Sequence, residues 1–238
     1  RLRREVNYHD YRYHVLDDPL ISDGEYDLLM VEIRRLEAEY PHLFTVDSLT
    51  ELREIMSGST QSVFVLGHTR PGDGGGGMFH WNVTSKADDD DGLVVANREI
   101  KIGRWIRVDS RSLDIRWFGA NENQDATRAV QAALRAAQRG GEVTIPAGSF
   151  RISRPLEIPQ GVHLVGTGLL SVLHYSGPSG TGCLRVAGEP KSISLAISRL
   201  NILVLKSGAV GVDLSGMSYS RFDHITVHLR QPNTSGFY

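Results

Sequence analysis

The hydrophobic and polar positions of the chain predict a helical start followed by a long run of strands. From residue 23 the apolar and aromatic positions recur at intervals of three and four, which places them on one helix face. Ser22 and Glu25 have the spacing of a capping box, and Pro41 ends the pattern. A second helix is predicted from Leu2 to about Tyr13, so residues 1–45 are expected to form a helical hairpin. The predicted stripe consists of Tyr26, Leu29, Ile33, Leu36 and Tyr40.

After the hairpin the pattern changes to the alternation that is typical of strands. A short helix is predicted over 49–55, and the segments "SVFVLGH", "MFHWNV", "DGLVVA" and "GRWIRVD" are predicted strands. The glycines at 74–77 could suggest a phosphate-binding loop. We interpret them as a structural turn, because they lie between strands and lack the Lys-Ser/Thr of a P-loop. Residues 46–118 are therefore expected to form a small β-rich domain.

An alanine-rich helix, "QDATRAVQAALRAAQ", is predicted within residues 119–141, where Gly140 and Gly141 end it. A stripe of small residues packs closely against a flat surface, so this helix is expected to cap the end of a solenoid. The stripe consists of Ala129, Val130, Ala133, Leu134 and Ala137.

Residues 142–238 are predicted to be strand after strand, separated by Gly, Asn and Ser. Arg199 and Phe222 begin two similar segments and lie 23 residues apart, a period typical of one coil of a β-solenoid. A coil cannot bury its inner face alone, so the coils are expected to stack. The predicted inner positions are Leu200, Ile202, Val204, Ile225, Val227 and Leu229.

Charge and cysteine content exclude several classes of protein. The formal net charge is -2, which gives no general attraction to nucleic acid or to an anionic membrane. Residues 1–43 carry a net charge of -4, so the N-terminal segment is acidic. The single cysteine, Cys183, excludes an internal disulfide and a cysteine-based zinc site, and we interpret it as a buried strand thiol. No apolar run approaches the ~20 residues of a membrane span.

The N-terminal segment "EVNYHDYRYHVLDDPLISDGEYDLLMVEIRRLEAEYPHL" resembles the small helical domain that opens bacterial NAD-dependent DNA ligases. The resemblance rests on Tyr-x-Tyr, Asp-x-Pro, Ser-Asp-x-x-Tyr-Asp and Leu-Glu-x-x-x-Pro, and covers about 45 residues. It implies a site for the nicotinamide mononucleotide half of NAD. An aromatic ring can stack on the cationic nicotinamide, and carboxylates can pair with its charge. The positions that match are Tyr13, His14, Asp23, Tyr26 and Asp27.

Ligase activity itself is not expected. Adenylyl transfer needs a nucleophilic lysine in a Lys-x-Asp-Gly motif. The nearest string begins at Lys86 and reads "KADD", without the glycine, and the cysteines of a ligase zinc finger are absent.

The remainder of the chain resembles the N-terminal part of phage tailspikes and related proteins of the pectate-lyase-like superfamily. The residues that carry this resemblance are "SLTELREI", "DGGGGMFHW", "GRWIRV", "IRWFGA", "DATRAVQAALRAA" and "GGEVTIPAGSFRIS", in that order. One departure is "GANENQDAT", where the family often has a more acidic run. The resemblance implies a right-handed parallel β-helix, a homotrimer, a place in the virion tail, and partners among other tail proteins and host surface glycans.

Polysaccharide-cleaving members of this superfamily use paired acidic side chains. The candidates are Glu157, Glu189, Asp213 and Asp223, and none is convincing, so we expect this piece to lack a catalytic site. The histidine spacings show no metal pattern, and no metal site is expected.

The sequence therefore predicts a mixed α and β chain with a ligase-like hairpin (1–45), a small β-rich particle-binding domain (46–118), a capping helix (119–141) and the first coils of a right-handed parallel β-helix (142–238). The chain begins at Arg1 and ends at Tyr238 within a strand pattern, so we expect a piece of a longer protein.

The leading hypothesis is the N-terminal part of a phage tailspike or tail fibre, assembled as a homotrimer in the host cytoplasm, without a cofactor. The longer protein would then be a glycosidase, a lyase or an adhesin. The alternatives are a working module that binds NAD or nicotinamide mononucleotide on a β-helix scaffold, and an inert N-terminal carrier. Binding to nucleic acid or membrane is not expected.

Overall fold

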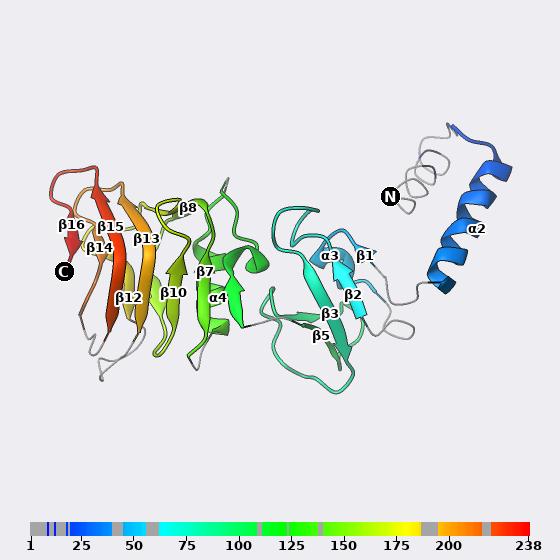
Figure 1. Cartoon of the computed structure of the whole chain (residues 1–238), viewed down its shortest axis with the longest axis horizontal. Helices are drawn as coiled ribbons and strands as arrows, with labels where there is room; N and C mark the ends of the chain where they lie inside the picture. The colour runs from blue at the N-terminus through cyan, green and yellow to red at the C-terminus, as the bar shows by residue number, and fades with distance from the viewer. Residues whose placement is uncertain are drawn as a thin grey trace.

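The computed structural model describes residues 9, 12, 18, 20–39, 45–55, 62–108, 111–122, 124–137, 140–186, 195–215 and 220–238. The backbone alone is described at positions 33, 34 and 36–39. The elements run from the N-terminal helix α2 through a small sheet to stacked strands that end at β16 (Figure 1).

Helix α2 spans Asp23–Glu39. The predicted capping box is confirmed: the Ser22 amide donates to Glu25 Oε2 at 2.9 Å, and the Glu25 amide donates to Ser22 Oγ at 3.3 Å. Tyr26 and Leu29 are half-buried, whereas the rest of the predicted stripe lies outside the described side chains. Of the earlier helix, only His9 and Arg12 are described, and both are helical.

The small domain is a sheet with strand order β1-β2-β3-β5-β4, in which β1 and β2 are parallel and the other pairs are antiparallel. The alternation expected from the sequence is confirmed, because Val63, Val65, Phe79 and Trp105 are fully buried. They form one core with the short helix α3. The elements are β1 (Thr45–Val46), α3 (Leu49–Leu52), β2 (Ser62–Val65), β3 (Gly77–Asn82), β4 (Val94–Ala96) and β5 (Arg104–Arg107).

The following strands form a parallel β-helix whose coils stack side by side (Figure 1). One sheet has the order β6-β7-β10-β13-β11-β8, with β15 paired to β13, and the other has the order β16-β14-β12-β9. The strands are β6 (Ser112–Asp114), β7 (Glu142–Ile145), β8 (Gly148–Ile152), β9 (Leu156–Ile158), β10 (His163–Gly166), β11 (Ser171–Tyr175), β12 (Gly182–Val186), β13 (Ala196–Val204), β14 (Val210–Val212), β15 (Arg221–Leu229) and β16 (Ser235–Phe237).

Most of the predicted inner positions are confirmed. Leu200, Ile202 and Val204 of β13 are at most 1% exposed. Ile225 and Val227 of β15 are partly buried against the same core. Leu229 is 46% exposed, although it pairs in register with the buried Val204. The register also differs from the period of 23, because Leu200 pairs with Ile225 and Ile202 with Val227.

The capping helix α4 spans Thr127–Ala136 and follows the 3-10 turn η1 (Ile115–Phe118). The predicted stripe from Ala129 to Ala137 is buried as expected. The segment also covers the open edges of the first coil. Gln131 Nε2 donates to the Glu157 carbonyl at 2.9 Å, and Gln131 Oε1 accepts from the Glu157 amide at 2.8 Å. Thr127 Oγ1 accepts from the Ser153 amide at 2.8 Å. These contacts satisfy backbone groups of the edge strand, which would otherwise invite pairing with another chain.

Packing indicates where the small domain ends. Leu113, Ile115 and Phe118 belong to the β-helix core, and β6 pairs with β7. We therefore propose that the β-helix unit begins near residue 111, earlier than the expected boundary at 118.

A buried arginine joins the two cores. Arg107 is 5% exposed and donates to the carbonyls of Gly75, Gly76 and Gly92 at 2.8, 2.7 and 3.1 Å. Its guanidinium lies 4.6 Å from the ring centroid of Phe79, in the small domain, and 4.6 Å from that of Trp117, which packs on the β-helix. Burial lowers the pKa of Arg107 to about 10, although Asp90 and Asp114 oppose this effect.

Candidate functional site

The described part of the predicted nucleotide site lies on one face of α2. Asp23, Tyr26 and Asp27 have the i, i+3, i+4 spacing that places side chains next to one another on a helix. Both carboxylates are exposed and Tyr26 is half-buried. Tyr13 and His14 lie outside the described residues. The arrangement offers an acidic helix face with an aromatic ring, and the site as a whole stays a prediction.

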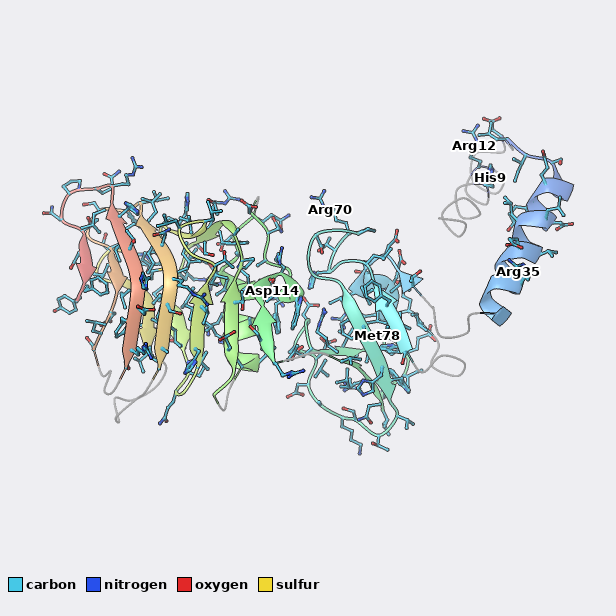
Figure 2. The ribbon with its side chains drawn as sticks, in the orientation of Figure 1. His9, Arg12, Arg35, Arg70, Met78 and Asp114 are labelled. Atoms are coloured by element: carbon cyan, nitrogen blue, oxygen red, sulfur yellow. The ribbon has the colours of Figure 1, made fainter. Side chains whose placement is uncertain are left out.

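A second candidate is a large open groove between the small domain and the capping helix. Its volume is about 1590 Å³. One wall is made by two loops of the small domain, at residues 68–73 and 88–91. The floor and the opposite wall are made by η1, α4 and the first coils of the β-helix. Figure 2 shows Arg70 on the outside of the first of these loops and Asp114 where the β-helix meets the small domain. The charged lining residues are His68, Arg70, Asp73, Asp88, Asp89, Asp90, Asp91, Arg116, Asp125, Arg128, Arg135, Arg154, Glu157 and Arg185.

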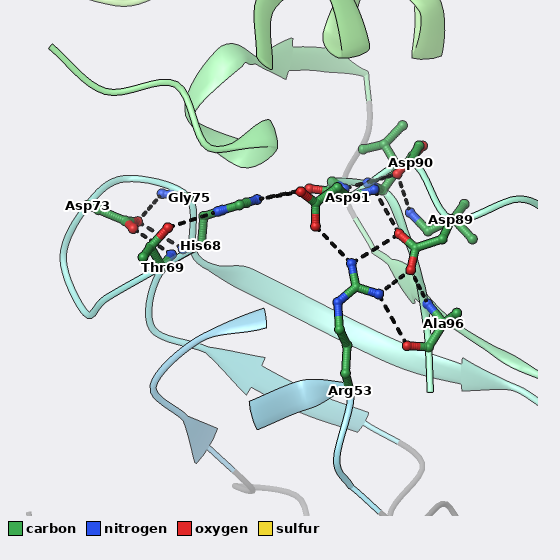
Figure 3. Close-up of polar contacts among 12 residues, drawn as sticks. Arg53, His68, Thr69, Asp73, Gly75, Asp89, Asp90, Asp91 and Ala96 are labelled. Atoms are coloured by element: carbon green, nitrogen blue, oxygen red, sulfur yellow. Dashed lines mark hydrogen bonds and ion pairs between the residues drawn. The ribbon is translucent and has the colours of Figure 1, made fainter. Parts of the chain in front are cut away.

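The glycine-rich turn after β2 is closed by its own carboxylate, Asp73. This side chain accepts hydrogen bonds from the amides of His68, Thr69, Arg70 and Gly75 at 2.8–3.1 Å (Figure 3). Burial alone would raise the pKa of Asp73, but these four bonds outweigh it and the pKa is lowered. The Asp73 carboxylate thus takes up four backbone amides of this segment, in agreement with its interpretation as a structural turn.

The acidic loop "KADDDDG" is also structural. Arg53 forms ion pairs with Asp89 and, at 2.8 Å, with Asp91 (Figure 3). His68 Nε2 lies 3.1 Å from the Asp91 carbonyl oxygen. Asp90 Oδ1 accepts from the amides of residues 92, 93 and 94 at 2.7–3.0 Å. This wall of the groove is therefore built from internally bonded carboxylates.

The pKa values in this loop are shifted in opposite directions. Burial would raise the pKa of Asp89 and Asp91, but hydrogen bonds from Arg53 to both, and from His68 to Asp91, outweigh burial and lower it. Burial raises the pKa of Asp90, despite the bonds from its backbone donors. Asp89 and Asp91 therefore stabilise the folded state when they are ionised, and Asp90 does the opposite.

We predict that acid destabilises the small domain through Asp89. Its pKa is lower in the folded chain than its ordinary value of 3.8. The stabilisation is present above the unfolded pKa and is lost as the pH falls through the folded one. The Asp89→Asn variant should lose about 1 kcal/mol at neutral pH, allowing for solvent screening.

The measurement for this prediction is urea unfolding from pH 7 down to pH 3. The difference in stability between the natural chain and Asp89→Asn should shrink as the pH falls below about 4. Asp47→Asn, outside this network, is the matched control. A difference that stays constant over the whole pH range would contradict the prediction.

The acidic residues considered for polysaccharide cleavage have other partners. Glu157 pairs with Arg185 at 2.5 Å, Asp223 with His224 at 2.7 Å, and Asp213 accepts from the Ser215 amide at 3.0 Å. Glu189 lies outside the described residues. Burial raises the pKa of the Cys183 thiol, in agreement with its interpretation as a buried strand residue.

No group of three or more His, Cys, Asp or Glu side chains among the described residues could hold a metal ion. No helix among them is long and apolar enough to cross a membrane.

The arginines of the groove were not singled out from the sequence. Arg128 and Arg135 are exposed on α4 and lie two turns apart, so a count of the polar positions of the predicted capping helix could have found them. Arg128 and Arg135 lie in the same groove as Arg154 and Arg185. This proximity depends on the coil register, which the sequence pattern did not predict.

Three family models match successive parts of the chain. Residues 1–52 match "DNA ligase-like, N-terminal NAD+-binding domain", residues 45–110 match "Phage tail protein small four-stranded beta-sheet domain", and residues 114–231 match "Rhamnogalacturonase A/epimerase, pectate lyase-like". Both resemblances expected from the sequence are therefore supported.

The curated proteins that match the chain include several DNA ligases. The ligase of Roseiflexus castenholzii is 60% identical over 50 residues, which is 21% of this chain and 7% of the ligase. The ligase of Koribacter versatilis is 45% identical over 71 residues, 29% of this chain and 10% of the ligase. The chain thus corresponds to a small part of the length of these relatives.

Several similar solved structures are phage tailspikes. Tailspike protein 2 of bacteriophage CBA120 gives a TM-score of 0.59 at 17% identity, covering 86% of this chain and 37% of that one. The tailspike of Acinetobacter phage vb_AbaP_AS12 gives 0.65 at 14% identity, covering 82% and 37%. Tailspike gp49 of Acinetobacter baumannii bacteriophage Fri1, described as a capsular polysaccharide depolymerase, gives 0.55 at 18% identity, covering 80% and 41%. The chain therefore has the fold of phage tailspikes over most of its length, and it begins with a segment similar to the NAD+-binding domain of DNA ligases.

Proposed function

We propose that this chain is the N-terminal portion of a phage tailspike or tail fibre. The observation that carries the proposal is the order of its parts: a small sheet, a capping segment and a parallel β-helix, which together follow the tailspike fold. The small domain serves attachment to the particle, through other tail proteins. The β-helix begins a body that binds or degrades host surface polysaccharide, and the protein resides in the virion tail.

Assembly tests this proposal. We expect light scattering of the 238-residue chain to give three times its mass of 26.3 kDa, because the proposed tailspike is a homotrimer. A strictly monomeric chain at all concentrations would count against the tailspike assignment. In a longer chain, cleavage of capsular or lipopolysaccharide sugar would identify a depolymerase, and binding without cleavage would identify an adhesin.

A second function rests on the helix face of Asp23, Tyr26 and Asp27. The segment is 60% identical over 50 residues to a DNA ligase, and its capping box holds the first turn of α2 in place. We propose that this face binds nicotinamide mononucleotide, without ligase activity. Exposed carboxylates beside an aromatic ring suit a ligand with a cationic ring.

An NMR titration of the whole chain with nicotinamide mononucleotide tests this second function. We expect saturable shifts of tyrosine signals that disappear in Asp23→Ala and in Tyr26→Ala. Asp88→Ala, an exposed carboxylate in the groove, is the control and should retain the shifts. The absence of shifts at millimolar ligand would leave the N-terminal segment as a folded carrier and would not affect the tailspike proposal.

A further inference from the structure

The groove between the small domain and the capping helix has most of its arginines on the α4 side and most of its carboxylates on the loops of the small domain. Arg128 and Arg135 are exposed on α4, and Arg154 is exposed in the turn before β9. Within the described part of the chain, no carboxylate forms an ion pair with Arg128 or Arg135. Arg185 is paired with Glu157 at 2.5 Å, and Arg116 with Asp114 at 2.5 Å. The α4 side of the groove is therefore cationic.

The helix fixes the spacing of the two unpaired arginines. Seven residues of α-helix place Arg128 and Arg135 on the same face, about 10 Å apart along the axis. Ala132 lies between them and also lines the groove. Its small side chain leaves space between the two guanidinium groups. The Gln131 side chain holds the helix to β9 through two hydrogen bonds with the backbone of Glu157, so this face is rigidly placed. A ligand with two separated anionic groups fits this arrangement.

The opposite wall has a different chemistry. It contains the carboxylates of Asp89, Asp90 and Asp91, each already bonded within the small domain. Carboxylates with remaining lone pairs accept hydrogen bonds from hydroxyl groups, and Gln124 in the groove can both donate and accept. This wall suits a sugar chain whose hydroxyl groups face it while its carboxylates face α4.

The size and the lining of the groove exclude other ligand classes. About 1590 Å³ exceeds the roughly 300–1,000 Å³ of small-molecule pockets, so the groove can hold several units of an extended chain. Sequence-tolerant binding of single-stranded nucleic acid uses aromatic platforms. Among the described residues that line this groove, Phe118 is the only Phe, Trp or Tyr, and it is only 4% exposed. The predominance of charged and amide side chains does not suit an apolar peptide or a lipid.

We propose that this groove binds an acidic saccharide, with Arg128 and Arg135 each holding a carboxylate of a sugar acid and the Asp89–Asp91 wall accepting from sugar hydroxyls. The inference rests on the proposed function and adds to it the chemical class of the glycan and the place where it is first held. Arg154 and Arg185 extend the cationic side toward the β-helix coils. The pairing of arginine with carboxylate is bidentate and directional, which favours carboxylated sugars over neutral ones.

The test is calorimetric titration of the whole chain with tetragalacturonate, with maltotetraose as the neutral probe of equal length and polyphosphate as a polyanion without hydroxyl-bearing sugar units. We expect saturable binding of tetragalacturonate that weakens with added salt, and no binding of maltotetraose. Arg128→Gln and Arg135→Gln should each weaken binding about tenfold, because each removes a charge-assisted hydrogen bond. Arg230→Gln, an exposed arginine on the far coil, removes the same charge and should bind as the natural chain does.

Several results would overturn the inference. Equal affinity in the Arg128→Gln, Arg135→Gln and Arg230→Gln variants would place binding elsewhere. Tighter binding of polyphosphate than of tetragalacturonate would show a general cationic surface. A change in oligomeric mass of a variant that carries both Arg128→Gln and Arg135→Gln would identify the groove as a contact between copies of the chain. A lack of tetragalacturonate binding by a trimeric chain would overturn this inference and leave the tailspike proposal standing.

Discussion

Replacing Arg107 with methionine is expected to lower the free energy of unfolding by about 3 kcal/mol. The guanidinium donates to three backbone carbonyls, and two of the glycines concerned, Gly75 and Gly92, are buried. Each buried acceptor left without a partner costs about 1–3 kcal/mol. Methionine removes the desolvation penalty of the buried charge, which offsets part of this loss. The cost of the unpaired carbonyls exceeds this gain, because methionine offers no hydrogen-bond donor to replace the guanidinium.

Arg104, on the same strand, is the matched control. It also donates to three backbone carbonyls, those of Ala87, Lys101 and Gly103, at 2.8–3.0 Å. Because Arg104 is only half-buried, water can replace its donors, and Arg104→Met should cost about 1 kcal/mol or less. Urea unfolding followed by tryptophan fluorescence measures both. Equal losses in the two variants would mean that burial of the carbonyls does not decide the cost.

Arg107 also contacts Phe79 and Trp117, which belong to different cores. Its loss should therefore loosen the coupling between the small domain and the β-helix. We expect the unfolding curve of Arg107→Met to broaden or to separate into two transitions, while that of Arg104→Met keeps the shape of the natural curve.

Leu200→Ala is expected to destabilise the chain by about 2–5 kcal/mol. Leu200 is 1% exposed in the interior of the β-helix and belongs to β13, which pairs with β10, β11 and β15. Truncation removes buried methyl groups and leaves a cavity that parallel coils on both sides cannot collapse into. The loss should appear in thermal or urea unfolding of the β-helix.

Leu229→Ala supplies the same chemical change on the neighbouring strand. Leu229 is 46% exposed, so its truncation should cost about 1 kcal/mol or less. Comparable losses for Leu200 and Leu229 would contradict the interior position of Leu200, or would show that Leu229 is covered in the assembled protein.

Local pattern was sufficient for most elements of the fold. The capping box at Ser22 and Glu25 involves residues three apart, so the chain itself brings them together. The alternation of β13 placed Leu200, Ile202 and Val204 inward, since side chains alternate across a strand. Leu229 pairs in register with Val204 but is exposed, because β15 is paired only to β13 in the described part of the chain, and burial of a strand depends on the next coil.

The sequence by itself determined the order of the units, the strands and their inward faces, the buried stripe of α4, and the helix face that holds Asp23, Tyr26 and Asp27. These depend on periodicities within one element. Tertiary structure decided the coil register, the three hydrogen bonds from Arg107 to distant carbonyls, and the groove with Arg128 and Arg135. It also decided that Asp73 accepts hydrogen bonds from the backbone amides of the glycine-rich turn. These features depend on which distant segments come together, and a local periodicity carries no information about the length of the connections that bring them there.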